Sequence, residues 1–166
     1  SKLYALLGHY LTENQTLLEL GSGPGIDLEY FKKHYKVVGS DFSNEFLKRL
    51  QMKHPDLTFE KINAIKMNTA QKFDAIFSNK VLHHLTLQEL YESLQKQKYI
   101  LTSYGVIAHS FWIGDESFKM KGLLFNYYQK DVLISLISEY FEVLETFSYA
   151  EFEANDSLFI IARVKI

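Results

Sequence analysis

Three glycines at alternate positions, with an acidic residue on either side, form the clearest chemical pattern in the chain. Gly21, Gly23 and Gly25 follow Glu19, and Asp41 lies about 20 residues beyond the first glycine. Residues without a side chain let the backbone turn sharply and approach a bound ligand closely. An acid at the end of the next strand accepts hydrogen bonds from both hydroxyls of a ribose. The pattern predicts a site for a ribose-containing ligand.

Two classes of ligand use such a turn. Dinucleotide-binding loops follow the pattern G-x-G-x-x-G, but Ile26 stands where the third glycine would be. Pro24 removes one N–H group that a diphosphate would use. The carboxylate of Glu19 suits a ligand that carries an ammonium and a sulfonium group, and it suits a diphosphate poorly. These residues disfavour a nicotinamide-dependent oxidoreductase, which is kept as an alternative.

Two adjacent histidines, His83 and His84, follow the fourth expected strand, at the sheet edge where ligands bind. Histidine titrates near neutral pH, so either residue is a candidate general base. The alternative is that both only shape the loop. No metal site is expected, because adjacent side chains rarely aim at one ion and no carboxylate has ligand spacing.

An alternation of strands and helices must position these residues. Short runs of β-branched and aromatic residues predict seven strands, which begin at Thr16, Lys36, Leu57, Phe73, Gly105, Phe141 and Ser157. Stretches with helical spacing lie between them, and in the first of these Ile26, Tyr30 and Phe31 share one face. The last two strands are too close for a crossover helix, so they form an antiparallel hairpin. We expect a parallel α/β sheet, covered on both faces, that ends in this hairpin.

Length and composition narrow the class of protein. The chain has 166 residues, which suits one domain, and a formal net charge of -2, which does not suggest a nucleic-acid binder. It has no cysteine, which excludes disulfides and thiolate metal sites. No apolar stretch approaches the roughly 20 residues of a membrane span, and the N-terminus does not read as a signal peptide. We therefore expect a cytoplasmic protein that does not bind membranes.

The sequence ELGSGPG followed by VVGSDFS resembles the first two motifs of the class I, Rossmann-like S-adenosylmethionine-dependent methyltransferases. The resemblance continues through FEKINAIKM, FDAIFSNKVLHHL and YYQKDVLISLISEYFEVLE. It implies one domain over residues 1–166 and a three-layer sandwich. The implied sheet has seven strands in the order 3-2-1-4-5-7-6, with strand 7 antiparallel.

The resemblance also implies roles for individual residues. The methionine part of S-adenosylmethionine would be held by Glu19, Gly21, Ser22, Gly23 and Gly25. The adenosine part would be held by Asp41 at the ribose and by Phe42, Asn63, Ala64 and Ile65 at the adenine. Ser78 and Asn79 would face the methionine end or the substrate. Asn63 stands where the family usually has an acid, and its side-chain oxygen would accept the adenine amino group.

The acceptor of the methyl group is not specified by these motifs. SNKV follows the fourth strand, where enzymes that methylate the amino groups of DNA bases carry Asn/Asp-Pro-Pro-aromatic. We therefore expect a small-molecule acceptor and no nucleic acid, and the oligomeric state stays open. The aromatic segment 111–128 either roofs the substrate site or packs the last helix. A non-catalytic partner subunit with the same fold is the alternative function.

Overall fold

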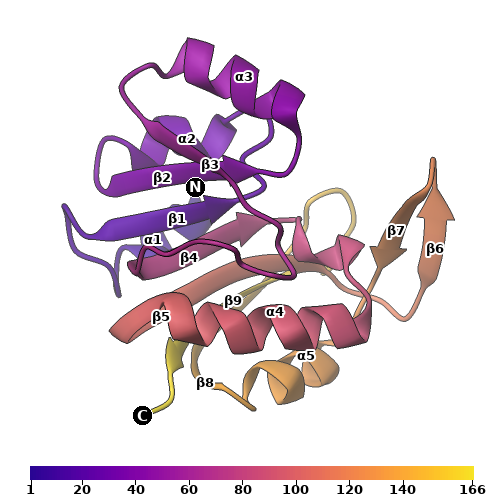
Figure 1. Ribbon diagram of the computed structural model, residues 1–166. Coiled ribbons are helices and arrows are strands. Elements are labelled where there is room, and N and C mark those ends of the chain that lie inside the picture. The colour runs from indigo at the N-terminus through magenta and orange to yellow at the C-terminus, as the bar shows by residue number, and fades with distance from the viewer.

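The computed structural model describes residues Ser1–Ile166 and shows one twisted sheet with helices on both faces (Figure 1). The strands of the main sheet are β1 (Thr16–Leu20), β2 (Lys36–Asp41), β3 (Thr58–Lys61), β4 (Phe73–Asn79), β5 (Leu101–Trp112), β8 (Phe141–Tyr149) and β9 (Ser157–Val164). The helices are α1 (Lys2–Leu7), α2 (Ile26–Phe31), α3 (Asn44–Lys53), α4 (Leu87–Ile100) and α5 (Lys130–Ile137), with a 3-10 turn, η1, at Leu82–His84.

The order of the main sheet is β3-β2-β1-β4-β5-β9-β8. The first five strands pair in parallel, and β9 runs antiparallel to both β5 and β8. This is the predicted order once the two strands of a separate hairpin are left out of the count. The prediction of a parallel α/β sheet closed by an antiparallel hairpin is confirmed.

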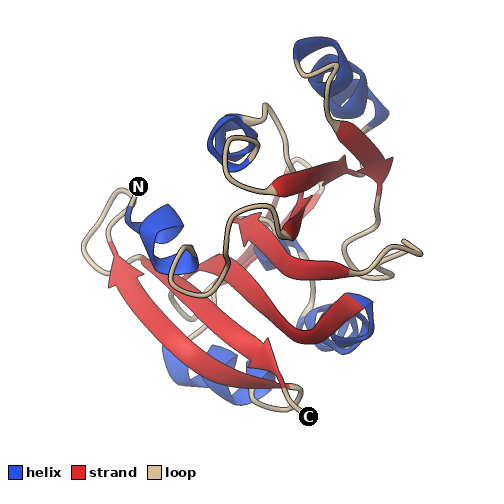
Figure 2. Cartoon of the chain, turned by 90° about the vertical axis from the view of Figure 1, so that its left-hand side faces the viewer, coloured by secondary structure: helices blue, strands red, loops and turns tan.

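The two faces of the sheet are buried against different helices, as the turned view shows (Figure 2). On β9, Leu158 and Ile160 pack into a core with α4 and α5, whereas Phe159 and Ile161 pack into a core with α1, α2 and α3. Successive side chains of a strand point to opposite faces, so an unbroken apolar strand such as β9 must be covered on both sides.

Helix α2 departs from the predicted pattern. Leu28 and Phe31 are fully buried, but Ile26 is 73% exposed, so the expectation that Ile26 shares the buried face is wrong. The helix has only six residues and begins at Gly25, whose φ of 86° is left-handed. Ile26, the first residue of this helix, therefore lies beside the glycine turn, at the exposed edge of the sheet.

A second, two-stranded sheet was not predicted. β6 (Ser117–Met120) and β7 (Leu123–Asn126) form an antiparallel hairpin that projects from the body of the protein (Figure 1). Lys121 and Gly122 form its turn, both with positive φ (52° and 78°). Turns of this kind match the twist of a hairpin. The sequence signal was a glycine between two short apolar runs.

No helix of the chain has the length and apolar character that crossing a membrane requires.

Candidate functional site

The glycine turn after β1 has a backbone that only glycine tolerates well. Gly21 and Gly23 have φ values of 60° and 51°. A Cβ atom added to Gly21 would lie 2.7 Å from Cγ2 of Val81, so any side chain at this position would also clash with Val81. Gly25 packs differently, because a Cβ there would lie 2.9 Å from Cδ2 of Leu50 in α3. The first two glycines thus shape the surface of the turn, and the third lets α2 pack against α3.

Asp41 ties the glycine turn to the next helix. Its Oδ2 accepts a hydrogen bond from the backbone N–H of Gly23 at 3.1 Å, and its Oδ1 accepts one from the N–H of Ser43 at 3.0 Å. The hydroxyl of Ser43 in turn caps α3 by accepting from the N–H of Phe46. Each carboxylate oxygen of Asp41 keeps one lone pair, which suits the two hydroxyls of a ribose.

Glu19 is a buried acid without a full set of partners. Its side chain is 2% exposed, and its Oε1 atom has no hydrogen-bond partner. Burial, and to a smaller extent the nearby carboxylates of Asp27 and Asp41, raise the pKa of Glu19 to about 8. A buried polar atom without a partner is costly and calls for an explanation. Glu19 is not among the residues that line the cavities at the turn, so a cationic group, such as the ammonium or sulfonium of a ligand, would have to bind close to the buried carboxyl to supply the missing partner.

Two cavities meet at the glycine turn, and both are lined by Gly21 and Asn79. The first, which we call the Asp41 cavity, has a volume of about 490 Å³ and also contains Asp41, Phe42 and Ala64. The second, the Asp27 cavity, has a volume of about 640 Å³. One ligand lying along the turn would therefore reach both cavities.

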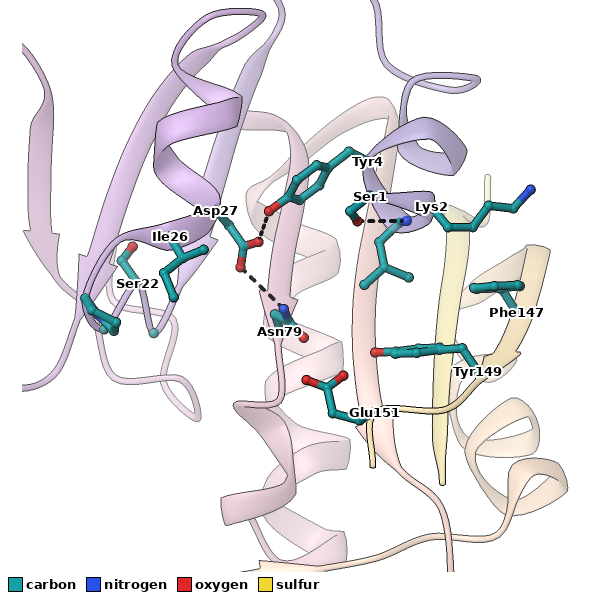
Figure 3. A pocket seen from close by; sticks show the side chains of 14 residues that line it. Ser1, Lys2, Tyr4, Ser22, Ile26, Asp27, Asn79, Phe147, Tyr149 and Glu151 are labelled. Carbon is teal, nitrogen blue, oxygen red and sulfur yellow. Dashed lines mark hydrogen bonds between the residues drawn. The ribbon is translucent and has the colours of Figure 1, made fainter. Parts of the chain in front are cut away.

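The Asp27 cavity is polar at its centre (Figure 3). The hydroxyl of Tyr4 donates a hydrogen bond to Oδ1 of Asp27, and Nδ2 of Asn79 donates one to Oδ2 at 3.4 Å. Oδ1 of Asn79 accepts from the hydroxyl of Ser110 at 2.6 Å, which fixes the orientation of the amide. Glu151 comes from the loop after β8, on the other side of the cavity.

Several residues expected at the adenine do lie at the Asp41 cavity. Phe42 is 58% exposed and, with Ala64, lines this cavity. Ile65 is half-buried and packs at the edge of the core instead. Ser22 lines the Asp27 cavity, and its hydroxyl accepts from the N–H of Ser40 at 3.1 Å. The predicted contacts of these residues with a cofactor remain predictions.

In the structure, the side-chain oxygen of Asn63 binds backbone N–H groups of its own loop. Oδ1 accepts hydrogen bonds from the N–H groups of Ile65 at 2.8 Å and Lys66 at 3.0 Å. A side-chain carbonyl has two lone pairs, so none is left for an adenine amino group. Only the Nδ2 group, a donor, remains. The expected acceptor role does not follow from this arrangement, because the side chain closes its own loop.

Ser78 also departs from expectation. It is fully buried, and its hydroxyl lies 2.7 Å from Nδ1 of His109 inside the core. Since successive side chains on β4 alternate in direction, Asn79 faces the cavities and Ser78 does not. The expectation that both face the ligand is therefore corrected for Ser78.

The two candidate histidines lie on η1, beside the Asp41 cavity. His83 is buried and lines neither cavity, and its pKa is lowered to about 3, mainly by burial and to a smaller extent by His84 and Lys80. His84 lines the Asp41 cavity, and its Nδ1 lies 2.8 Å from the carbonyl oxygen of Leu124. Neither residue lines the Asp27 cavity, so nothing in this geometry supports a role for them as a base there.

Four residues of the Asp27 cavity were not singled out from the sequence: Tyr4, Asp27, Tyr149 and Glu151. Tyr4 belongs to α1 and the last two come from the far end of the chain, so only folding brings them together. Asp27 lies two residues after Gly25, the last glycine of the turn. This position was the only feature of the sequence that could have indicated one of the four residues.

Part of the chain matches a known protein family. A model of the methyltransferase domain family matches residues 17–105. An uncharacterized methyltransferase of Alkaliphilus oremlandii is 28% identical over 134 residues, which are 76% of this chain and 61% of that protein. The chain thus spans about three fifths of the length of this curated relative.

Solved structures share the fold at low sequence identity. The 1,6-didemethyltoxoflavin-N1-methyltransferase of Burkholderia thailandensis has a TM-score of 0.84 at 20% identity, covering 99% of this chain and 77% of its own. A methyltransferase of Methanosarcina mazei has a TM-score of 0.85 at 17% identity, covering 98% of both chains. The N-methyltransferase NodS of Bradyrhizobium japonicum has a TM-score of 0.78 at 16% identity, covering 99% and 85%.

The family match spans more than half of the chain and includes the glycine turn, Asp41 and the end of β4. The sheet order and the site geometry agree with it. This chain belongs to the methyltransferase domain family, whose methyl donor is S-adenosylmethionine.

Proposed function

We propose that this chain transfers a methyl group from S-adenosylmethionine to a small-molecule acceptor bound in the Asp27 cavity. The observation that carries the proposal is the shared wall of the two cavities, formed by Gly21 and Asn79. A cofactor with its adenosine in the Asp41 cavity would present its sulfonium at this wall. The acceptor would then lie on the other side of the same wall.

The residues at the site fit this cofactor. Asp41 would bind the ribose hydroxyls, Phe42 would pack on the adenine, and Glu19 would oppose the positive charge. When bound, S-adenosylmethionine supplies an activated methyl group, so the protein mainly has to align the acceptor and exclude water. Alignment of this kind lowers a barrier by up to roughly 7 to 11 kcal/mol in intramolecular analogues.

A small-molecule acceptor agrees with the size of the Asp27 cavity, about 640 Å³, which lies within the usual range for such ligands. One of the similar structures supports this class. The Burkholderia thailandensis enzyme was crystallised with 1,6-didemethyltoxoflavin and S-adenosylhomocysteine. The formal net charge of -2 does not suggest a protein that binds a nucleic acid.

Titration calorimetry with S-adenosylmethionine, S-adenosylhomocysteine and NADH tests the proposal. We expect both sulfur compounds to bind and NADH not to bind. Asp41→Asn removes the charge at the ribose and should weaken binding about 10- to 100-fold. Asp56→Asn, at an exposed loop acid outside both cavities, is the matched control. Binding of NADH without binding of either sulfur compound would refute the proposal.

A further inference from the structure

We propose that the methyl acceptor is an amine, whose nitrogen is bound by the carboxylates of Asp27 and Glu151. This inference rests on the proposed function and names the class of substrate for the same site. Figure 3 shows both carboxylates directed toward the space beside Asn79, from opposite sides of the Asp27 cavity. An amino group placed between them would lie next to the wall that the two cavities share.

Asp27 has a carboxylate whose donors within the protein are both neutral. Tyr4 donates through its hydroxyl and Asn79 through its amide. The pKa of Tyr4 is raised well above its ordinary value by burial and by the hydrogen bond to Asp27, so its phenol stays protonated as a donor. The charge of Asp27 is thereby oriented without being neutralised. Such a group binds a cationic or N–H donor with a charge-assisted hydrogen bond.

Glu151 is held less tightly and remains available. Its nearest cation is Lys80, whose Nζ lies 3.7 Å from Oε2. Lys80 is already engaged elsewhere, because its Nζ donates to the hydroxyl of Ser157 at 2.8 Å and lies 3.4 Å from the ring centroid of Trp112. Both carboxylate oxygens of Glu151 therefore retain lone pairs for a ligand.

An aromatic wall completes the cavity. The rings of Phe147 and Tyr149 stack with centroids 5.6 Å apart and an interplanar angle of 7°. The hydroxyl of Tyr149 is buried without a hydrogen-bond partner, and Figure 3 shows it directed toward Glu151 and the cavity. Nζ of Lys2 already lies 5.9 Å from the ring centroid of Phe147 and Nζ of Lys80 lies 5.3 Å from that of Tyr149, so the rings are suited to pack against the hydrocarbon part of a ligand. The wall and the unpartnered hydroxyl suit an amine that carries an apolar body.

The reaction needs the amine, the methyl group of the cofactor and water as the proton acceptor. A protonated amine first loses one proton to water while the carboxylates hold its remaining N–H groups. The nitrogen lone pair then forms the bond to the methyl carbon, and the carbon–sulfur bond breaks with its electrons going to sulfur. The products are S-adenosylhomocysteine, an N-methylated ammonium ion and the one proton already transferred to water.

The test measures binding of amine probes to protein saturated with S-adenosylhomocysteine. The probes are 2-phenylethylamine and butylamine, each compared with its alcohol, and 3-phenylpropanoate as the anion. We expect each amine to bind at least about tenfold more tightly than its alcohol, as charge-assisted hydrogen bonds predict. Asp27→Asn and Glu151→Gln should each remove this preference while leaving the affinity for S-adenosylhomocysteine within about threefold.

Glu153→Gln is the matched control, because Glu153 lies in the same loop as Glu151 but is exposed outside the cavity. It should leave amine binding unchanged. Equal binding of amines and alcohols would overturn the inference. So would a large loss of S-adenosylhomocysteine affinity in Asp27→Asn, which would make Asp27 a cofactor ligand. Failure of the wild-type protein to bind S-adenosylhomocysteine would instead refute the proposed function.

Discussion

Ser78 and His109 join two parts of the site through a buried hydrogen bond of 2.7 Å between Oγ and Nδ1. Nε2 of His109 lies 2.7 Å from Oε1 of Gln97, whose Nε2 donates to the hydroxyl of Ser93 at 3.0 Å. That hydroxyl donates to the carbonyl oxygen of Ala64 at the Asp41 cavity. Because Oε1 of Gln97 can only accept, the proton of the neutral His109 is on Nε2. The chain of bonds links the Ala64 loop to the end of β4.

Breaking this network should destabilise the protein. His109→Leu leaves the hydroxyl of Ser78 and the amide oxygen of Gln97 buried without partners, which costs about 1 to 3 kcal/mol for each group. We expect the free energy of unfolding in urea to fall by about 2 to 5 kcal/mol. His9→Leu, at an exposed position, should change it by less than about 0.5 kcal/mol. Equal effects of the two substitutions would show that the network contributes nothing.

Two buried histidines should lower the stability of the protein on acidification below pH 6.5, whereas Glu19, with its raised pKa, acts in the opposite direction as the pH falls from about 8. Burial lowers the pKa values of His83 and His109 to about 3, from 6.5 in the unfolded chain. Between pH 6.5 and about 3 the unfolded chain binds more protons, so the stability that is present above pH 6.5 is lost as the pH falls. For each histidine, the free energy of unfolding changes by up to about 1.4 kcal/mol per pH unit in this range.

Unfolding in urea between pH 7.5 and 4.5 checks this prediction. His83→Phe replaces one of the two groups with a ring that does not titrate, beside Phe125 whose centroid lies 5.4 Å away. The pH slope of this variant should be smaller than that of the wild type. A slope that the substitution leaves unchanged would contradict the assignment for His83.

Cofactor binding should release a proton from Glu19. With a pKa of about 8, this carboxyl is mostly protonated in the free protein at pH 7, and a cationic ligand favours its ionised form. The affinity for S-adenosylmethionine should therefore rise with pH up to about 8 and then level off. Calorimetry in buffers of different ionisation enthalpy counts the protons released. Glu19→Gln should abolish the release, and an equal count in both proteins would rule out Glu19 as the source.

The glycine turn offers a matched pair of substitutions. Gly21→Ala places a Cβ 2.7 Å from Val81 at a φ of 60°, whereas Gly122→Ala meets nothing within 4 Å at a φ of 78°. Both substitutions place an alanine in the left-handed backbone conformation, which costs about 1 kcal/mol. Only Gly21→Ala deforms the wall between the cavities, and it should weaken binding of S-adenosylhomocysteine at least about tenfold. Similar affinities in the two variants would mean that the turn does not contact the cofactor.

The glycine turn and the alternation of strands and helices were accessible from the sequence because they depend on local spacing, whereas the order of the strands came from the resemblance to the family. Gly21, Gly23 and Asp41 lie within one βαβ segment, where the path of the chain is nearly fixed once the strands are known. The hairpin of β6 and β7 was missed because its strands are only four residues long. Strands that short carry little periodicity.

The sequence by itself determined the fold class, the glycine turn and Asp41 at the end of β2. Only the tertiary structure decided which side chains share the Asp27 cavity, because Tyr4 and Glu151 are far apart in the chain and meet through packing on one sheet. It also decided which way neighbouring side chains point, so that Asn79 lines the cavities while Ser78 binds His109. Local pattern fixes the path of the backbone, but contacts between distant segments depend on how the whole chain buries its two apolar faces.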